Sequence, residues 1–247
     1  MDTQAELAVL KAKVASLQAQ VEGLQRNPSS WTQNIGNPAP LGLLSFGMTT
    51  LFLMYIDMEW SEGGVKELVI AYALWYGGVG QIIAGIWEML KGNTFAASAF
   101  SSYGFFWCGW SLFNSKVVEA GYTPGSKFAT GDALYLGQWG VLTFLFFLAT
   151  LQKNRCLQAV FLLLSITFWL LAGGVFDETC KIVAGYFGFL TGLAAIYTAF
   201  AEIYEETYGR SILPGLEPLK KKALKAIDST EPEPNSIQDI LPPAKNV

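Results

Sequence analysis

Residues 37–56 read NPAPLGLLSFGMTTLFLMYI, and no charged side chain interrupts this stretch. Its apolar core, Leu41 to Ile56, belongs to a charge-free run within residues 31–56. A helix that crosses the hydrocarbon core of a bilayer needs roughly 20 residues of this kind. The stretch therefore predicts a first membrane-spanning helix, and the prolines near its start mark where that helix begins.

Five further runs of spanning length follow the first. They are Leu68–Trp87, Gly92–Ser115, Ala133–Gln152, Cys156–Phe176 and Ile182–Ala201, and charged breaks separate them. Only 15% of the residues are charged, whereas a soluble domain carries about 25%. Together these runs predict an all-α membrane protein with six transmembrane helices per protomer, and they argue against a soluble helical protein.

Two polar segments flank the predicted transmembrane region, residues 31–210. In residues 1–30, apolar side chains recur at spacings of three and four, which predicts a cytosolic amphipathic helix that forms a coiled coil or lies on another surface. Residues 211–247 mix prolines with charges and are expected to form a disordered tail. Lysine and arginine in both segments place both tails in the cytosol by the positive-inside rule.

The prolines also decide which backbone groups are free where the first span begins. Pro40 suits the first helical position, whose N–H has no partner in a helix. Leu41, Gly42 and Leu43 would then present unpaired amides, and unpaired amides at a helix N-terminus attract anions. We therefore expect a substrate-binding segment over Asn37, Pro38, Ala39, Pro40, Leu41, Gly42 and Leu43.

The third predicted span begins in a similar way, at Asn93 or Thr94. Either side chain can cap a helix, and Thr94 to Ala96 would present unpaired amides. Odd-numbered spans start on the same side of a membrane, so two positive helix ends can face one vestibule and hold a carboxylate. Two ordinary capped helix starts at the membrane surface are the alternative interpretation.

Other features exclude several classes of function. The chain has no histidine, which removes the commonest general base and metal ligand. Its cysteines, Cys108, Cys156 and Cys180, form no CxxC pair and suit an apolar core. We therefore expect no enzyme activity, metal or cofactor. A net charge of −4 without a basic patch also argues against nucleic acid as a partner.

Three motifs resemble one known family, the acetate uptake transporters, also called succinate–acetate permeases. They are NPAPLGL in the first span, GNTFAASAFSSYGFFW at 92–107 and AEIYEETYGR at 201–210, and the resemblance covers residues 34–213. It implies six-helix protomers that assemble as hexamers in the bilayer, with a separate path through each protomer. It also implies acetate as the substrate, with succinate or other short acids carried by some members.

The resemblance further implies roles for individual residues. Phe46, Tyr103 and Leu164 match a narrow apolar constriction, and Ala195 matches a position that influences how large an acid can pass. An apolar ring of this kind can exclude hydrated ions by dewetting. Each of these residues would also suit plain helix packing.

The mechanism stays open at the level of sequence. Acetate could cross with a proton, which would call for an ionisable residue in the membrane, and Glu88 and Glu202 are the candidates. A channel that draws the anion through helix-end amides is the other mechanism. A non-transporting scaffold or sensor that uses the N-terminal heptads is the alternative function. Ammonia transport fits less well because histidine is missing. Plasma and organelle membranes are both compatible with the sequence.

Overall fold

The computed structural model describes residues 11–18, 35–120 and 125–217. Within these ranges every regular element is helical, so the all-α prediction is confirmed for the described residues. The body of the chain contains α2 (Ala39–Asp57), η2 (Gly63–Val65), α3 (Lys66–Tyr72), the π-helix η3 (Ala73–Gly80), α4 (Gln81–Leu90), α5 (Thr94–Ala120), α6 (Phe128–Thr150), α7 (Arg155–Gly174) and α8 (Glu178–Tyr208).

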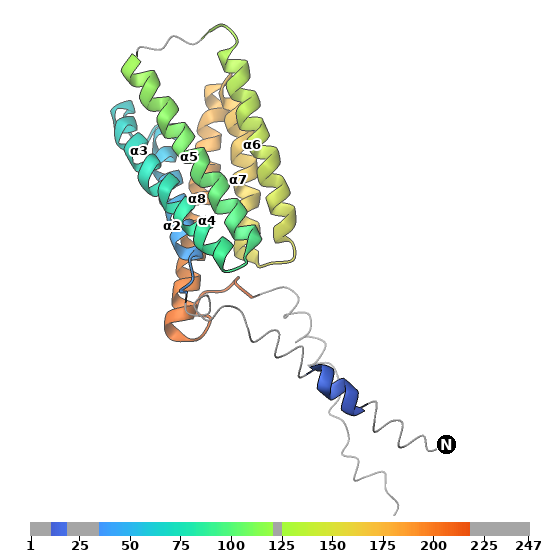
Figure 1. Ribbon diagram of the computed structural model, residues 1–247. Helices are drawn as coiled ribbons and strands as arrows, with labels where there is room; N and C mark the ends of the chain where they lie inside the picture. Colours follow the sequence, from blue (N-terminus) through green and yellow to red (C-terminus); the bar gives the residue numbers. More distant parts are fainter. Residues whose placement is uncertain (1–10, 19–34, 121–124, 218–247) are drawn as a thin grey trace, which may run out of the picture.

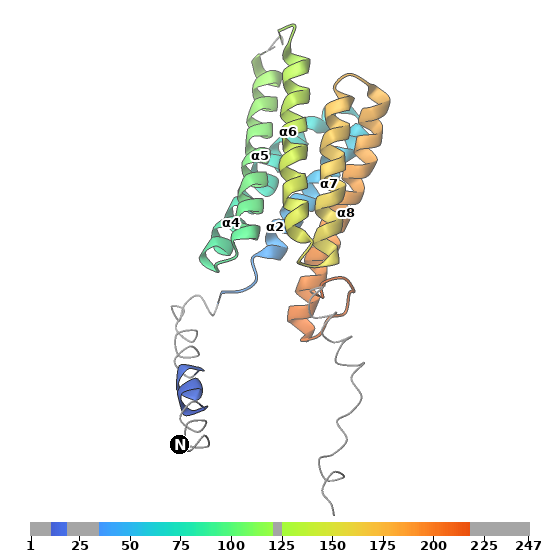
Figure 2. The same ribbon diagram turned by 90° about the vertical axis from the view of Figure 1, so that its right-hand side faces the viewer.

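The long helices form an up-and-down bundle (Figures 1 and 2). Because α3, η3 and α4 follow one another without a break, they make one rod that corresponds to the second predicted run. The starts of α2, α5 and α7 lie at the same end of the bundle (Figure 1). This common end follows from the alternation of direction along the chain, and it brings three helix N-termini together.

Five helical segments in the described part of the chain are long and apolar enough to cross a membrane. They are Ala39–Asp57, Lys66–Leu90, Phe128–Thr150, Arg155–Gly174 and Glu178–Tyr208. The third predicted span, α5, is 27 residues long but is not among them. Its sequence contains several serines together with glycine and tryptophan, which are less apolar than the leucine and valine of the other segments.

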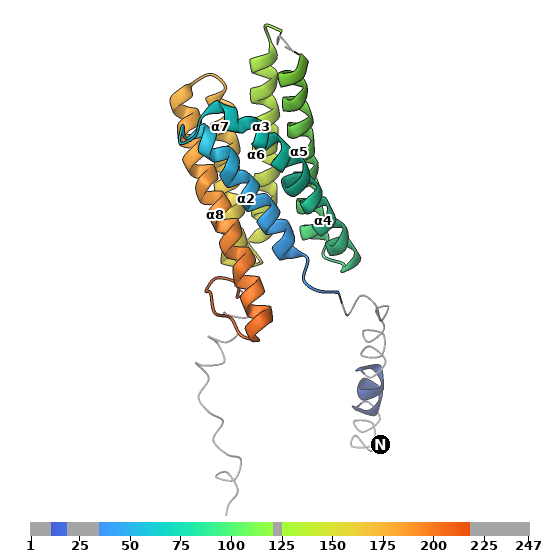
Figure 3. The ribbon, with the colours of Figure 1, turned by 90° about the vertical axis from the view of Figure 1, so that its left-hand side faces the viewer.

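Glycine lets α2 pack closely against α8 (Figure 3). A Cβ atom added to Gly192 would lie 2.9 Å from the Gly47 carbonyl oxygen and 2.8 Å from Leu51 Cγ. Gly185 of α8 meets Met58, the residue after α2, and Gly188 of α8 meets Met54 of α2 in the same way. Small residues allow this approach where lipid gives apolar side chains little reason to associate. The glycine face of the sixth run therefore packs against α2 within the protomer.

The glycines of the second rod divide between two neighbouring helices. Gly77 and Gly80 pack against Thr49 and Ser45 of α2, whereas Gly78 and Gly85 pack against Cys108 and Ser101 of α5. Three of these glycines, Gly77, Gly78 and Gly80, lie in the π-helix η3, and Gly85 lies in α4. The rod thus fixes the distance between α2 and α5, which face each other across the interior of the bundle.

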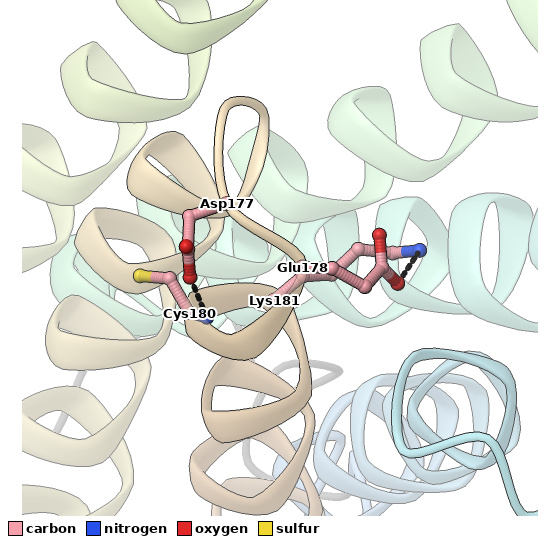
Figure 4. Close-up of polar contacts among 4 residues, drawn as sticks. All are labelled: Asp177, Glu178, Cys180 and Lys181. Carbon is pink, nitrogen blue, oxygen red and sulfur yellow. Dashed lines mark hydrogen bonds and ion pairs between the residues drawn. The ribbon is translucent and has the colours of Figure 1, made fainter.

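Side-chain caps set the starts of α7 and α8. Asn154 Oδ1 accepts the Leu157 N–H at 2.9 Å, and Asp177 Oδ1 accepts the Cys180 N–H at 2.6 Å. One turn into α8, Lys181 pairs with Glu178 at 3.2 Å, on the side of the helix away from the cap (Figure 4). Each cap satisfies an amide that the helix itself leaves unpaired.

The two predicted tails lie mostly outside the described residues. Residues 11–18 are helical, with Val14 48% and Leu17 53% exposed, and the rest of the heptad segment is not described. The expected disordered tail needs a correction at its start, because residues up to 217 fold back on α7. The Gly215 carbonyl oxygen accepts the Arg155 N–H at 3.0 Å, and Tyr197 Oη donates to the Pro214 carbonyl oxygen at 2.9 Å.

We predict that Gly192→Ala destabilises the protein by about 1–3 kcal/mol, because the new methyl group would press on α2 backbone. The measurement is the thermal unfolding temperature of the purified protein in detergent. Gly109→Ala is the control, because Gly109 has no atom within 4 Å of an added Cβ. Equal unfolding temperatures for both variants would contradict the packing described here.

Candidate functional site

A mainly apolar cavity of about 90 Å³ lies between the facing sides of α2, α5 and α7. At its polar end, Asn93 and Lys153 come from loops and Glu202 comes from the last two turns of α8. The side chains deeper in come from α2, α5 and α7, together with Gln81 of α4. It is lined by Ala39, Leu43, Phe46, Gln81, Asn93, Phe95, Ala96, Ala99, Phe100, Tyr103, Lys153, Leu157, Val160, Phe161, Leu164 and Glu202. We call the end with Asn93, Lys153 and Glu202 the mouth.

The structure brings together the three residues of the expected constriction. Phe46, Tyr103 and Leu164 line the same cavity, and they are 6%, 4% and 4% exposed. The Phe46 and Tyr103 ring centroids are 5.8 Å apart. All three lie about two or more helical turns beyond the starts of α2, α5 and α7. We call this group the neck.

The Tyr103 hydroxyl has its hydrogen committed to a neighbour. Thr143 Oγ1 donates to the Trp139 carbonyl oxygen at 2.7 Å, and it lies 2.9 Å from Tyr103 Oη. Since a threonine hydroxyl has a single hydrogen, Tyr103 must be the donor to Thr143. The Tyr103 oxygen can therefore accept a further hydrogen bond but has no hydrogen left to give.

Gln81 adds a second polar group to the cavity wall, directly after the π-helix. It is fully buried, and its Nε2 donates to the Gly77 carbonyl oxygen at 2.7 Å. That bond fixes the amide orientation, because the atom facing a carbonyl must carry hydrogen. The other atom, Oε1, has no hydrogen-bond partner among the described residues. π-Helices often occur at functional sites.

The first helix start differs from the expectation of three unpaired amides. Pro38 adopts helical dihedrals (φ −79°, ψ −18°) as the cap residue, so α2 begins at Ala39 rather than Pro40. The Gly42 N–H then donates to the Pro38 carbonyl oxygen at 3.3 Å, and the Ala39 N–H donates to Asn37 Oδ1 at 3.2 Å. The prediction of an unpaired Gly42 amide was wrong for this reason.

The second helix start is capped by Asn93, not by Thr94. Asn93 Oδ1 accepts the Ala96 N–H at 3.3 Å, so the expectation of a free amide at Ala96 is also wrong. Ala39, Asn93 and Ala96 nevertheless line one cavity. The two helix starts thus border one cavity, but with their first amides already partly occupied.

Asn37 and Asn93, whose side-chain oxygens each accept a backbone N–H at a helix start, also bind a glutamate. Asn37 Nδ2 donates to Glu202 Oε2 at 2.8 Å, and Asn93 Nδ2 donates to Glu88 Oε2 at 2.8 Å. Glu88 is only 2% exposed, and the two carboxylates lie near enough to repel each other. The sequence singled out both glutamates, but their pairing with the asparagines could not be read from it.

Lys153 is a mouth residue that the sequence analysis did not single out. Its ammonium lies 4.6 Å from the Phe95 ring centroid, and the side chain lines the cavity. Nearby, Lys91 Nζ donates to the Gly36 carbonyl oxygen at 3.3 Å. The position of both lysines could have been predicted from the sequence, since each falls in a loop on the side of the membrane where α2 and α5 start. At this position a lysine can attract a carboxylate.

Ala195 lies behind the neck rather than on the cavity wall. It is fully buried, and a Cβ atom on Gly47, the residue after Phe46, would be 3.2 Å from the Ala195 Cβ. A side chain of another size at position 195 would therefore reach the cavity only by moving α2.

Comparisons with known proteins agree with this architecture. The sequence model of the GPR1/FUN34/yaaH family matches residues 22–216. The succinate-acetate/proton symporter SatP of Escherichia coli (strain K12) is 40% identical over 185 residues, which cover 73% of this chain and 95% of that protein. Acetate permease A of Emericella nidulans is 34% identical over 197 residues, which cover 74% of this chain and 66% of that protein.

A solved structure of the bacterial acetate channel SatP also superposes on this fold. It matches with a TM-score of 0.67 and 39% identity, and covers 73% of this chain and 99% of that one. These relatives carry the names of a symporter, a permease and a channel. The apolar helices and these relatives together show that the chain is a multi-pass integral membrane protein, and the family model and the identity to SatP show that it belongs to the GPR1/FUN34/yaaH family.

Proposed function

We propose that this protein carries acetate and similarly small monocarboxylates across a membrane through the cavity between α2, α5 and α7. The observation that carries the proposal is the arrangement of one continuous apolar cavity with charged groups at its mouth and three buried side chains at its neck. The names of the relatives support acetate as the substrate. Succinate, with two carboxylates, fits a cavity of about 90 Å³ less easily.

We infer that α5 also spans the membrane, which makes six spans with α5 as the third in chain order. Phe95 and Tyr103 of α5 line the cavity together with residues of α2 and α7, which are themselves long and apolar enough to cross a membrane. A helix that shares their interior must cross at the same depth. Its serines are tolerated because they face protein: Ser111 Oγ, for example, donates to the Ile70 carbonyl oxygen at 2.8 Å.

We also infer that the protein works as a homo-oligomer, for which the family resemblance implies a hexamer. Large apolar side chains remain exposed on the outer faces of the helices, among them Leu134, Val141, Leu145, Trp75 and Phe105. These faces suit contact with lipid or with other protomers. The residues of one chain line the cavity without help from a second, which supports a separate path through each protomer.

The neck sets the energetic problem for an acid. Moving a bare carboxylate into an apolar site costs several kcal/mol or more even after relaxation. Protonation costs about 1.4 kcal/mol for each pH unit above the pKa of the acid, which makes ~3–4 kcal/mol at neutral pH for a pKa of roughly 4–5. Crossing together with a proton is therefore the cheaper route through this neck.

The mouth has groups for both parts of such a crossing. Lys153 would attract the carboxylate from solution. Glu202 and Glu88, each held by an asparagine at 2.8 Å, are the groups we propose to take part in proton exchange. Their carboxylates already occupy the helix starts, so an anion would be repelled there unless a proton is shared. This arrangement favours proton-coupled transport over an anion channel.

A non-transporting scaffold would not need this cavity, so the direct test is transport itself. We predict that purified protein in liposomes takes up labelled acetate faster than protein-free liposomes. Uptake should be stronger when the outside is more acidic, since a proton crosses with each acetate. Rates equal to those of protein-free liposomes at every pH between 5 and 8 would reject the proposed function.

We predict that Leu164→Ala widens the neck and lets larger monocarboxylates such as lactate pass. The substitution removes a side chain that is 4% exposed and lines the cavity. Uptake of labelled lactate relative to acetate measures the size limit, and Phe46→Ala should shift it in the same direction. Leu162→Ala is the matched control, because Leu162 lies on the same helix but is 41% exposed. An unchanged size limit in both neck variants would reject the assigned neck.

We predict that Lys153→Gln raises the KM for acetate roughly two- to fivefold, as expected for the loss of one solvent-screened attraction of up to ~1 kcal/mol. The maximal rate should change little, because the ammonium acts at the mouth and not at the neck. Raising the salt concentration should shrink the difference between variant and wild type. Arg155→Gln is the control, since Arg155 is exposed and does not line the cavity. The same change in KM for both variants would argue against a specific role for Lys153.

A further inference from the structure

The hydrogen-bonding groups at the neck differ in kind from those at the mouth. The mouth offers a donor, the Lys153 ammonium. At the neck, the groups that can still form a hydrogen bond are oxygen acceptors. Gln81 Oε1 has no hydrogen-bond partner among the described residues, and the Tyr103 hydroxyl already donates its hydrogen to Thr143. A solute therefore meets acceptors where water is excluded.

Gln81 lies at the same depth as the neck, as its neighbours in the sequence show. Gly80 packs against Ser45, the residue before Phe46, and Ile82 packs against Gly104, the residue after Tyr103. Gln81 itself lines the cavity. Among the described cavity-lining residues, Gln81 is the one with a buried side-chain nitrogen or oxygen, Oε1, that lacks a hydrogen-bond partner. A buried oxygen in this state is costly unless a solute or water donates to it.

We propose that Gln81 and Tyr103 form a hydrogen-bond acceptor pair that admits small solutes carrying a hydrogen donor, so that the neck passes undissociated acetic acid and also neutral amides of the same shape, such as acetamide. The inference rests on the proposed function and extends it. A carboxylate has no hydrogen to donate and would face two oxygens. Acetic acid and acetamide each present a donor beside a carbonyl group and a methyl group.

Thr143 acts in this scheme as a positioning residue. By giving its own hydrogen to the Trp139 carbonyl oxygen, it can only accept from Tyr103, which keeps the tyrosine hydrogen out of the cavity. Replacing Thr143 by valine, which has nearly the same shape, would release that hydrogen. The neck would then offer a donor, and an anion would be tolerated better.

Neutral amides make it possible to distinguish the effect of pH on the solute from its effect on the residues that line the cavity. The titratable groups that line the cavity are Tyr103, Lys153 and Glu202, with Glu88 bound to Asn93 beside them. Acetamide has no ionisable group in the range tested, so the pH dependence of its flux reports the wall alone. Acetate flux corrected for that dependence should follow the undissociated fraction, which falls tenfold for each pH unit above the pKa.

The experiment uses the full chain in liposomes and measures labelled acetate uptake, labelled acetamide uptake and acetate-dependent current between pH 5 and 8. We expect saturable acetamide uptake that acetate at pH 5 inhibits, and acetate uptake without net negative current. Gln81→Leu, which keeps the volume and removes the acceptor, should lower both uptakes at least tenfold. Gln158→Leu is the control, because Gln158 also donates to a carbonyl oxygen, that of Thr150 at 3.2 Å, but does not line the cavity.

Thr143→Val keeps the test decisive if Gln81→Leu does not fold. This variant should gain a current carried by acetate anions that move inward, whereas a misfolded variant would only lose uptake. Acetate uptake in the wild type that carries net negative charge, together with exclusion of acetamide, would overturn the inference while leaving acetate transport in place. Wild-type uptake of both solutes by Gln81→Leu would overturn it as well. Absence of any protein-dependent acetate uptake would instead reject the proposed function.

Discussion

A carboxylate that enters the neck loses its water, and the protein offers little to replace it. Phe46 and Leu164 present carbon atoms, and Tyr103 and Gln81 present oxygens. The charged groups stay at the mouth, where Lys153 and Glu202 line the cavity. Under the proposed function, this separation of charge from the dry centre would concentrate an acid at one end and require that its charge be neutralised before passage.

The neck holds its shape because glycines lie next to its residues in the sequence. Gly47 follows Phe46 and packs against α8, and Gly104 follows Tyr103 and packs against Ile82 and the Gly78 carbonyl oxygen. A site positioned by backbone-to-backbone contacts has little freedom to widen. The π-helix adds to this rigidity, because the Gly77 carbonyl oxygen fixes the amide of Gln81. Helix packing and solute selection are thus linked through adjacent residues.

Much of the fold could be predicted from the sequence because the bilayer demands long apolar helices. The six predicted runs all appear in helices, but the helix ends differ from the ends of the runs. For example, α6 begins at Phe128 rather than Ala133, because a helix can include a polar residue such as Asp132 outside the apolar part of the run. The start of α2 was displaced by one residue because Pro38 takes helical dihedrals and serves as the cap. Such dihedrals depend on the neighbouring helices and have no signature in the motif.

The site was less predictable than the fold. The hydrophobic periodicity of each helix could not predict that Phe46, Tyr103 and Leu164 lie together. The family resemblance predicted it, and in the structure the three side chains line one cavity. Gln81 and Lys153 were missed as cavity residues because each has an ordinary alternative, a buried polar side chain and a loop charge. The pairing of Asn37 with Glu202 joins residues 165 positions apart and emerges only from the tertiary structure.

The central claim is that small acids cross through the interior of each protomer, past the helix starts at residues 37–43 and 93–96 and through the neck. The most direct measurement is a cryo-electron microscopy map of the assembled protein in lipid nanodiscs with bromoacetate, whose bromine marks the ligand. The account predicts ligand density inside the protomer, between Lys153 at the mouth and Phe46 at the neck. Lipid density against residues 37–43, with no passage beside them and ligand bound elsewhere, would contradict it.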